Sequence, residues 1–377
     1  MNFALSEEQE MLKKAARDFL ADKCSKAVVR AMVEDEKGYP PELWREMAGL
    51  GWMGLAFPEE YGGSGMSFLD LAVLLDETGR VCLPGPFFST VVLGGLAILD
   101  AGNDEQKRAY LPAIAGGESI FTLALTEEAA QYDAASIKVK AAADKDGYII
   151  SGAKFFVPDA HVADYLLCVA RTDEKAAAEE GVTVFIVDAK SPGISCTLLK
   201  TMAGDKLCEV EFDRVKVPGQ NILGELNRGW SVVERVMQRA AVAKCCEMVG
   251  AMQQSLEMAV DYAKERKQFG RPIGSFQAIQ HYCANMATDV DGARFTTYQA
   301  AWMMSEGLPC AKEVAIAKAW AGEAFGRVST LAHQVHGAIG CTIDHDLHFY
   351  TRRGKAAELT FGGGDFHREV VAQEMGL

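Results

Sequence analysis

The sequence lacks three features that would place the protein in large functional classes. None of its ten cysteines belongs to a C-x-x-C pair, which argues against a zinc or iron–sulfur site. It has no excess of positive charge, because 38 Lys and Arg stand against 52 Asp and Glu and give a net charge of −14. No apolar window approaches the length of a membrane span. We therefore expect no metal centre, no nucleic-acid partner and no membrane partner.

The N-terminus also lacks the pattern of a leader segment. Residues 1–9 carry no basic region ahead of an apolar run, so we expect a cytoplasmic protein whose thiols are reduced. What the chain does contain is apolar material, since 49% of its 377 residues are hydrophobic. That amount is sufficient for two or three packed units.

Hydrophobic periodicity divides the chain into three parts. Residues 1–119 show helical spacing that begins at a capping box formed by Ser6 and Gln9. Residues 120–225 alternate β-branched and aromatic residues between short turns, which is typical of an antiparallel barrel or sandwich. Helical spacing returns over residues 226–377. The predicted fold is α+β, with an N-terminal helical domain, a central β domain and a C-terminal helical bundle.

The most distinctive segment of the sequence runs from Tyr262 to Gln277. It predicts a helix that ends in a basic cluster, followed by Gly270 at positive φ, by Pro272, which prevents continuation, and by a helix that restarts at Ser275. An arginine beside free backbone N–H groups at such a break can hold a phosphate. A helix end whose dipole is offset by basic side chains is the more common arrangement.

The letters R-K-Q-F-G at residues 266–270, followed by Phe276 and Gln277, resemble the flavin-pyrophosphate segment of the acyl-CoA dehydrogenase family. The resemblance covers nearly the whole chain. It implies a central β-barrel or sandwich between helical domains, a C-terminal four-helix bundle, FAD as the cofactor and an acyl-CoA as the substrate. It also implies an oligomer, because in this family the C-terminal segments serve the flavin of a neighbouring subunit.

Thr126 to Asp133 resembles the family's T-E-P-x-x-G-S-D loop, which lies against the flavin and the acyl-CoA phosphates. Glu128, Gln131 and Tyr132 stand where the family has proline, glycine and serine. A polar loop between strands, without a ligand, is the alternative interpretation.

Gly152 to Pro158 resembles the family's G-x-K-x-W/F-I-T segment. Phe156 keeps the aromatic residue that covers the flavin ring, whereas Pro158 removes the threonine hydroxyl that approaches flavin N5. Without the family, a buried strand pair at Phe155 and Phe156 is expected.

Gln334 to Gly340 resembles the family's Q-x-x-G-G-x-G, where the backbone closely approaches the adenosine half of FAD. Ala338 is a mild departure from it. A glycine-rich interruption between two packed helices is the alternative.

The family's catalytic glutamate, which removes the α-proton of the acyl-CoA, lies in a Y-E-G-T motif. Matching His367 and Arg368 to the family's Q-R places Phe361 at the glutamate position. Some relatives instead carry the glutamate ten residues before the glycine that is here Gly250, which gives Ala240. Neither side chain accepts a proton.

The catalytic base is therefore unknown from the sequence. Asp365 and Glu247 are weak candidates, chosen by their proximity along the chain. Either acid is more often a solvated or helix-capping residue.

The resemblance assigns the remaining ligand contacts residue by residue. The flavin is assigned to Leu125, Thr126, Phe156, Val157, Pro158, Arg266, Gln268, Phe269, Phe276, Gln277, Gln334, Gly337, Ala338, Gly363 and Asp365. The acyl-CoA substrate is assigned to Tyr132, Ala240 and Gly362.

The sequence thus predicts an FAD-dependent acyl-CoA dehydrogenase-family subunit, acting on a branched or cyclic acyl-CoA. Because the glutamate is missing, we expect a homologous subunit to supply it in a dimer or an α2β2 tetramer, with an electron-transfer flavoprotein or similar protein as the acceptor. One alternative is a homo-oligomeric dehydrogenase with an unusual carboxylate base. The other is a scaffold or regulatory subunit without flavin.

Overall fold

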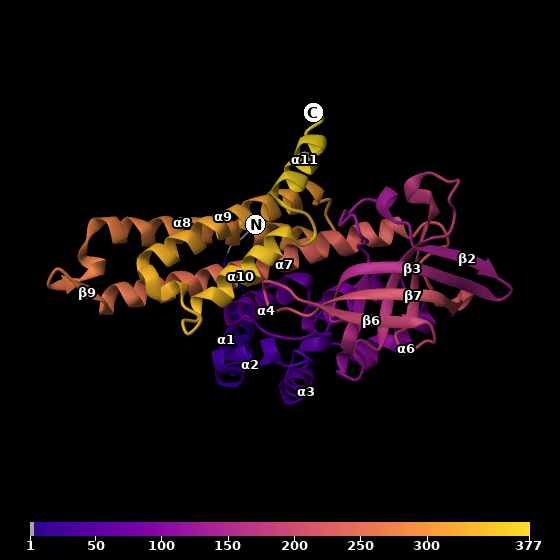
Figure 1. Cartoon of the computed structure of the whole chain (residues 1–377), viewed down its shortest axis with the longest axis horizontal. Coiled ribbons are helices and arrows are strands. Elements are labelled where there is room, and N and C mark those ends of the chain that lie inside the picture. The colour runs from indigo at the N-terminus through magenta and orange to yellow at the C-terminus, as the bar shows by residue number, and fades with distance from the viewer. Residues whose placement is uncertain (1–3) are drawn as a thin grey trace. The chain divides into compact units, whose positions relative to one another are not determined.

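The computed structural model describes residues 4–377, which fold into two compact units (Figure 1). The first, called here the helical unit, contains the chain up to Ala31 together with Ser67–Leu83 and Ala241–Leu377. The second, called the mixed unit, contains Met32–Met66 and Pro84–Ala240. The residues of the predicted N-terminal part are shared between these two units.

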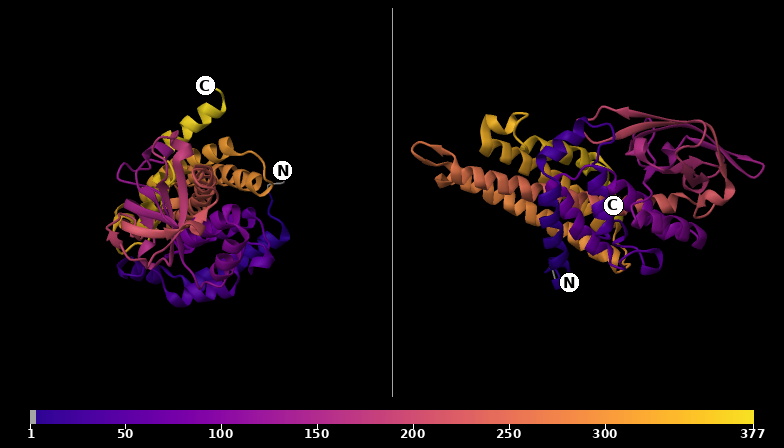
Figure 2. Two further views of the ribbon diagram at one scale, coloured as in Figure 1. Left: turned by 90° about the vertical axis from the view of Figure 1, so that its right-hand side faces the viewer. Right: turned by 90° about the horizontal axis from the view of Figure 1, so that it is seen from below.

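Eight helices belong wholly or in part to the helical unit, and the longest of them lie lengthwise beside one another (Figures 1 and 2). α7 begins in the mixed unit and continues into the helical unit at Ala241, and α2 begins in the helical unit. The helices are α1 (Glu7–Lys23), α2 (Lys26–Glu34), α4 (Phe68–Val81), α7 (Trp230–Glu265), α8 (Gln277–Ser305), α9 (Ala311–His336), α10 (Leu347–Leu359) and α11 (Gly364–Glu374).

The first helix begins as the sequence predicts. The Ser6 hydroxyl accepts a hydrogen bond from the backbone N–H of Gln9, and the Gln9 side chain accepts one from the N–H of Ser6. Each of these bonds satisfies a backbone donor that the helix itself leaves unpaired. The predicted capping box is confirmed.

Helices α4 and α7 cross with their backbones in direct contact. A Cβ on Gly79 would lie 2.0 Å from the carbonyl oxygen of Glu247, and a Cβ on Gly250 would lie 1.8 Å from that of Asp76. No real side chain tolerates such distances. The two glycines therefore allow the two helices to approach more closely than any larger residue would.

Charged groups are buried beside this crossing. Arg17 donates to the carboxylate of Glu77 over 2.7 Å, and the hydroxyl of Tyr298 donates to Asp76 over 3.1 Å. Burial raises the pKa of the Asp76 carboxyl. A buried carboxylate without a partner would be strongly unfavourable, so Glu77 and Asp76 of α4 each require the partner that they have. These two contacts join α4 to α1 and to α8.

The mixed unit combines a sheet of eight strands with short helices (Figure 1). Its helices are α3 (Pro41–Gly49), a π-helical segment (Phe88–Gly95), α5 (Leu96–Ala101), α6 (Asp104–Ala115) and the first part of α7. Its strands are β1 (Phe121–Ala124), β2 (Lys140–Asp144), β3 (Gly147–Pro158), β4 (Tyr165–Arg171), β5 (Val182–Asp188), β6 (Ile194–Leu199), β7 (Leu207–Pro218) and β8 (Ile222–Leu223).

The strand order is β6-β7-β3-β2-β4-β5-β8, with β1 added beside β4. β1 and β2 both run parallel to β4, whereas the other pairs are antiparallel. The expectation of a purely antiparallel domain is therefore wrong at these two pairs. Parallel pairing joins segments that are distant in sequence, and an alternating pattern contains no information about such partners.

The turn between α7 and α8 contains the basic cluster. α7 ends at Glu265, and two short strands, β9 (Lys267–Gln268) and β10 (Arg271–Pro272), form a hairpin around Phe269 and Gly270. Both turn residues have positive φ, at 53° and 78°. The predicted positive φ of Gly270 is confirmed.

The restart of the helix differs slightly from the prediction. Ile273–Ser275 forms one turn of 3₁₀ helix, and the Ser275 hydroxyl donates to the carbonyl of Pro272 over 2.7 Å. α8 consequently begins at Gln277 and not at Ser275. The Ser275 side chain therefore stabilises a local turn and does not cap the helix. Across residues 4–377, no helix combines the length and the apolar character needed to cross a bilayer.

The glycine contact between α4 and α7 leads to a stability prediction. We expect Gly250→Ala to lower the free energy of unfolding by about 2 kcal/mol or more, because the added methyl group would meet the backbone of α4. Gly326 in α9 is the matched control, since a Cβ there meets no atom within 4 Å. Gly326→Ala should raise the same quantity by about 0.5–1 kcal/mol. Urea unfolding followed by circular dichroism measures both, and equal effects would contradict the contact.

Candidate functional site

In the mixed unit, the loop at Thr126 is fixed to strand β3. The Thr126 hydroxyl donates to the carbonyl of Phe155, whose own N–H donates to the carbonyl of Thr126 over 2.8 Å. Glu127 accepts hydrogen bonds from the backbone N–H groups of Lys138 and Val139, both over 3.0 Å. The loop predicted to contact the flavin is thus held rigidly beside the strand that was predicted to do the same.

A buried lysine completes this anchor. The Lys154 ammonium is fully buried and donates to Glu127 over 2.7 Å and to the carbonyl of Leu125 over 3.0 Å. Burial lowers the pKa of Lys154, while Glu127 opposes that shift. Sequence reasoning gave Lys154 no role beyond its place in the motif. The sequence does contain a signal for this role, which is a lysine at an inward-facing position of a largely apolar strand. A buried ammonium requires hydrogen-bond acceptors, so such a lysine is expected to bind nearby carbonyl or carboxylate groups.

Strand β3 bulges at the position of the predicted flavin-covering residue. The register with β7 shifts between Lys154 and Val157, and Phe156 lies there with a φ of 56°. Its side chain is 47% exposed, whereas Val157 is buried. The alternative of a buried strand pair is wrong for Phe156. A bulge is the usual means of redirecting one side chain out of a sheet, and here it turns an aromatic ring toward solvent.

Two further predicted residues of this unit differ in accessibility. Tyr132 is half-buried in the loop that follows Glu127, where Asp133 caps the next turn by accepting from Ser136 N–H over 2.9 Å. Ala240 is completely buried within α7. Ala240 therefore contributes packing, and it offers no group that could take a proton.

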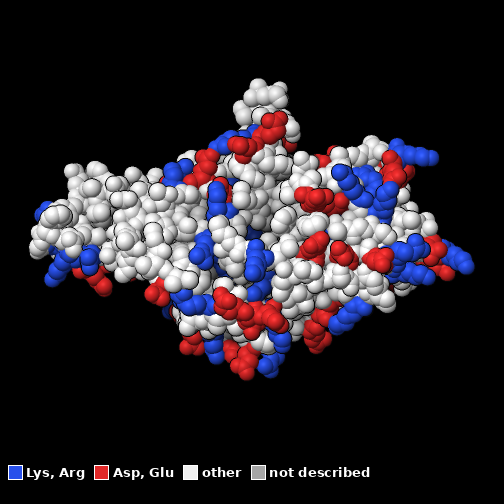
Figure 3. Space-filling model, in the orientation of Figure 1, with Lys and Arg blue, Asp and Glu red and all other residues white. Residues whose placement is uncertain are grey.

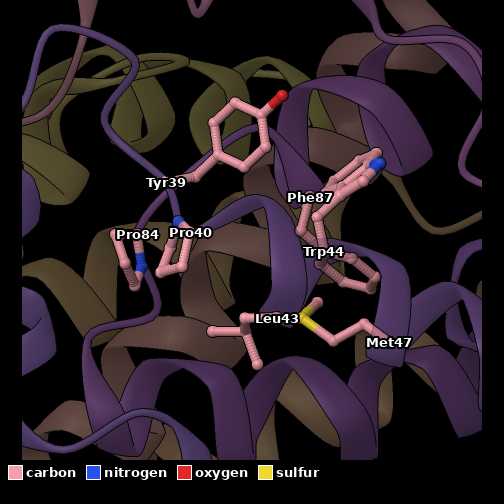
Figure 4. Close-up of a pocket in the computed structure, with 7 residues that line it drawn as sticks. All are labelled: Tyr39, Pro40, Leu43, Trp44, Met47, Pro84 and Phe87. Carbon is pink, nitrogen blue, oxygen red and sulfur yellow. The ribbon is translucent and has the colours of Figure 1, made fainter.

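An apolar pocket lies elsewhere in the mixed unit, between α3 and the segment around Phe87 (Figure 4). A Cβ on Gly85 would lie 2.4 Å from the Cβ of Tyr39, so this segment packs tightly. The pocket offers no charged group and contains none of the predicted site residues. Its lining is Tyr39, Pro40, Leu43, Trp44, Met47, Pro84 and Phe87.

In the helical unit, the hairpin between α7 and α8 presents aromatic and basic side chains to solvent. Phe269 is 92% exposed and meets Phe276 edge to face, with 6.0 Å between ring centroids. The guanidinium of Arg271 lies 4.2 Å from the centroid of the Phe276 ring. Arg266 and Gln268 are also exposed. These groups can contact a ligand or another subunit without rearrangement.

The glycine-rich segment at the end of α9 lies close to this hairpin. The ring of His336 stacks on that of Tyr262 near the end of α7, with 4.7 Å between centroids. Gly337 follows with a φ of 65° and a ψ of −148°, a backbone conformation that is almost restricted to glycine. Gln334 and Ala338 are exposed beside it. The structure thus brings together, within one unit, two segments that are about 70 residues apart in the sequence and that the resemblance assigned to the same cofactor.

The turn between α10 and α11 carries the position expected for the catalytic glutamate. Phe361 has a φ of 58° and Gly362 one of 95°. The side chain of Phe361 is 7% exposed. The turn is therefore a fixed and conformationally demanding structure whose central side chain is buried and apolar.

Two buried basic residues hold this turn. Lys318 in α9 donates to the carbonyls of Glu358 and Gly362, each over 2.8 Å. His367 donates from Nε2 to the carbonyl of Phe361 over 2.9 Å. Burial lowers the pKa of Lys318 to about 8 and that of His367 to about 4. The sequence suggested no role for Lys318; the available signal was a lysine on the apolar face of α9.

The two alternative acids are both engaged in ion pairs. The carboxylate of Asp365, in the first turn of α11, lies 3.0 Å from the guanidinium of Arg368. That of Glu247 lies 2.7 Å from the ammonium of Lys244. The absence of a base in this chain stays a prediction, and neither acid gains support from these contacts.

Comparison with known proteins connects these features to a family. The acyl-CoA dehydrogenase N-terminal domain matches residues 6–118, the middle domain residues 122–215 and the C-terminal domain residues 227–376. The chain is 32% identical to the probable acyl-CoA dehydrogenase YngJ of Bacillus subtilis, with all of both chains covered. It belongs to the acyl-CoA dehydrogenase family. The family and the three-part α+β fold predicted from the sequence are thereby confirmed.

Two further similarities are to proteins of multi-subunit complexes. The caffeyl-CoA reductase–Etf complex subunit CarC of Acetobacterium woodii is 34% identical over 97% of this chain and 98% of its own. The structure of the ChsE4–ChsE5 complex from Mycobacterium tuberculosis superposes with a TM-score of 0.91 at 30% identity, covering 100% of this chain and 99% of that chain.

The buried histidine at the turn leads to a pH prediction. Between pH 6.5 and 4 the unfolded chain binds a proton at His367 that the folded chain does not, because burial lowers its pKa from 6.5 to about 4. The free energy of unfolding should therefore fall by about 2 kcal/mol at this site between pH 7 and 5. His367→Gln keeps a donor for the carbonyl of Phe361 and cannot titrate.

Urea unfolding at several pH values tests this prediction. Between pH 7 and 5, the free energy of unfolding of the wild type should fall by about 2 kcal/mol relative to that of His367→Gln. A difference that does not change with pH would show that the pKa of His367 is the same in the folded and the unfolded chain.

Proposed function

We propose that this protein is an FAD-binding subunit of an acyl-CoA dehydrogenase-type enzyme whose homologous partner subunit supplies the catalytic glutamate. The observation that carries the proposal is the turn at Phe361. Lys318 and His367 hold its backbone in a defined shape, yet its central side chain is a buried phenylalanine. A turn maintained without its acid is expected of a subunit that keeps the binding framework and has lost the base.

The exposed groups of each unit fit a flavin dinucleotide. In the mixed unit, Phe156 presents an accessible aromatic ring at a bulge, while its neighbour Val157 supplies the buried side chain. In the helical unit, Gly337 leaves open space where a Cβ would stand, as close approach of an adenosine requires. When bound, FAD supplies the hydride acceptor of the reaction.

The residues proposed to hold FAD follow from the family motifs. In the mixed unit they are Leu125, Thr126, Phe156, Val157 and Pro158. In the helical unit they are Arg266, Gln268, Phe269, Phe276, Gln277, Gln334, Gly337, Ala338, Gly363 and Asp365. Tyr132, Ala240 and Gly362 are assigned to the acyl-CoA side, with a branched or cyclic acyl group as the proposed substrate.

The side chains define what each position can contribute. Phe156 excludes water from one face of a planar ligand and provides apolar contact. Pro158 offers neither a hydroxyl nor an N–H, so any hydrogen bond at that point must come from elsewhere. Arg266 places a permanent positive charge in a group of exposed residues, which suits a pyrophosphate.

The surface of the helical unit supports association with another subunit. The segment Gln277–Thr288 of α8 contains no Lys, Arg, Asp or Glu, and Figure 3 shows this part of the helix as an uncharged area. It adjoins the hairpin that carries the exposed ring of Phe269. Uncharged and aromatic surface of this kind marks protein interfaces. ChsE4 and ChsE5 form a complex with each other, which supports a homologous partner in a dimer or α2β2 tetramer.

The relative CarC is named as a subunit of an Etf complex. We therefore propose an electron-transfer flavoprotein, or a protein of similar type, as the electron acceptor of this enzyme. Neither of the two alternative functions, a homo-oligomer with an unusual base or a scaffold without flavin, gains a specific observation from the structure.

The visible spectrum of the purified protein tests the proposal. The chain co-purified with its homologous partner should show a flavin band that an acyl-CoA bleaches under anaerobic conditions, because only the complex contains a base. The chain alone should not be bleached. Bleaching of the chain alone would show that it carries its own base, and a complex without a flavin band would indicate a scaffold.

A substitution at the turn tests the role of position 361. In the FAD-loaded chain, an acyl-CoA should bleach Phe361→Glu about 100-fold faster or more than Phe361→Gln, because only the glutamate restores a general base. Phe361→Gln is the matched control, since it has nearly the same size and cannot accept the proton. Stopped-flow absorbance measures both rates. Equal rates in the two variants would contradict the assignment of the glutamate position to Phe361.

A further inference from the structure

Two cysteines lie on one face of the β6–β7 pair in the mixed unit. Cys196 is opposite Val210, and Leu198 is opposite Cys208, so the two cysteines are diagonal neighbours with side chains on the same face. Each thiol influences the pKa of the other. Cys196 is exposed, at an edge strand of the sheet, and Cys208 is completely buried.

A histidine contacts the buried thiol. The Sγ of Cys208 lies 3.7 Å from Nδ1 of His161, and Nε2 of the same ring lies 3.2 Å from the carbonyl oxygen of Lys37. Because a carbonyl only accepts hydrogen bonds, Nε2 carries the proton and Nδ1 is left as an acceptor for the Cys208 thiol. The ring is therefore placed to take a proton from Cys208.

The two thiols differ in accessibility and in the direction in which their pKa values are shifted. The neighbouring Cys208 lowers the pKa of Cys196, with burial acting in the opposite direction. The neighbouring Cys196, followed by burial, raises the pKa of Cys208, whereas His161 acts in the opposite direction. The accessible thiol is thus the one that ionises more easily, and the thiolate is the reactive form.

We propose that Cys196 and Cys208 form a peroxide-sensitive thiol pair in which Cys196 is oxidised first and Cys208 then closes an intramolecular disulfide. This site is independent of the proposed function, since it uses none of the residues assigned to the flavin or to the acyl-CoA.

The chemistry balances with hydrogen peroxide as the oxidant. The Cys196 thiolate attacks one peroxide oxygen, the O–O bond breaks, and the hydroxide that leaves is protonated to water, so that Cys196 becomes a sulfenic acid. The sulfur of Cys208 then passes its proton to His161 and attacks the Cys196 sulfur. The S–O bond breaks and the second oxygen leaves as water. Two thiols are oxidised and one peroxide is reduced to two waters.

The disulfide would act on the strand that carries Phe156. Diagonal neighbours in a regular sheet have Cα atoms about 7–8 Å apart. Because an unstrained disulfide requires a shorter distance, closing it must draw β6 and β7 together. Cys208 is also paired with Val157 of β3, directly after Phe156. A strained bond of this kind is easily reduced again, which makes the modification reversible.

Peroxide treatment followed by peptide mass spectrometry tests the proposal. The reduced full-length protein is exposed to a small excess of hydrogen peroxide, and its remaining thiols are then blocked with N-ethylmaleimide. We expect a cross-linked peptide that joins Cys196 to Cys208 and disappears on treatment with dithiothreitol. Absence of this peptide, while other cysteines are oxidised, would overturn the proposal.

Variants separate the two steps. Cys208→Ser should stop the reaction at a sulfenic acid on Cys196, which dimedone traps, and Cys196→Ser should leave Cys208 unoxidised. His161→Asn should slow disulfide closure by roughly 100-fold without changing the first oxidation, because it removes only the proton acceptor. Oxidation of Cys208 in Cys196→Ser at the wild-type rate would reverse the assigned order and contradict the proposal.

Cys341 supplies the matched control. It is exposed, and its Sγ lies 3.8 Å from Nδ1 of His333, so it shares the accessibility and the histidine contact of the proposed site. It belongs to the helical unit, whereas the proposed pair belongs to the mixed unit. Cys341→Ser should leave the yield of the Cys196–Cys208 disulfide unchanged. A loss of yield would show that the disulfide requires a third thiol.

Discussion

The ammonium of Lys318 is the interaction on which the candidate site of the helical unit depends. It binds the carbonyls of Glu358 and Gly362, so the end of α10 and the following turn are fixed to α9 from the inside. His367 holds the same turn from α11. All of these contacts are made to the backbone. These hydrogen bonds therefore do not depend on which side chain stands at position 361.

Much of the fold was predictable because local rules determine it. The capping box at Ser6 and the end of α7 at the basic cluster follow from side-chain chemistry within a few residues. The parallel pairing of β1 and β2 with β4 was not predictable, because it depends on contacts across more than 30 residues. The helix start at Gln277 was misplaced because Ser275 serves a local turn instead of a cap.

The candidate site was predictable only as a set of separate motifs. The exposure of Phe156 depends on a bulge, and a sequence pattern does not reveal one extra residue in a ladder. The role of Lys318 depends on which carbonyls a distant turn brings to it. The stacking of His336 on Tyr262 likewise joins two motifs that the sequence keeps apart. Motif letters thus suggested which residues to assign to the site, whereas the conformation and exposure of those residues come from tertiary contacts.

The crossing of α4 and α7 restricts which amino-acid substitutions this protein can accept during evolution. A Cβ added at Gly79 would clash with main-chain atoms of Glu247, and one added at Gly250 would clash with main-chain atoms of Asp76. A neighbouring residue cannot be made smaller to accommodate a new methyl group, since there is no side chain there to shorten. Compensating substitutions are thus impossible at this point, and only a displacement of an entire helix would make room.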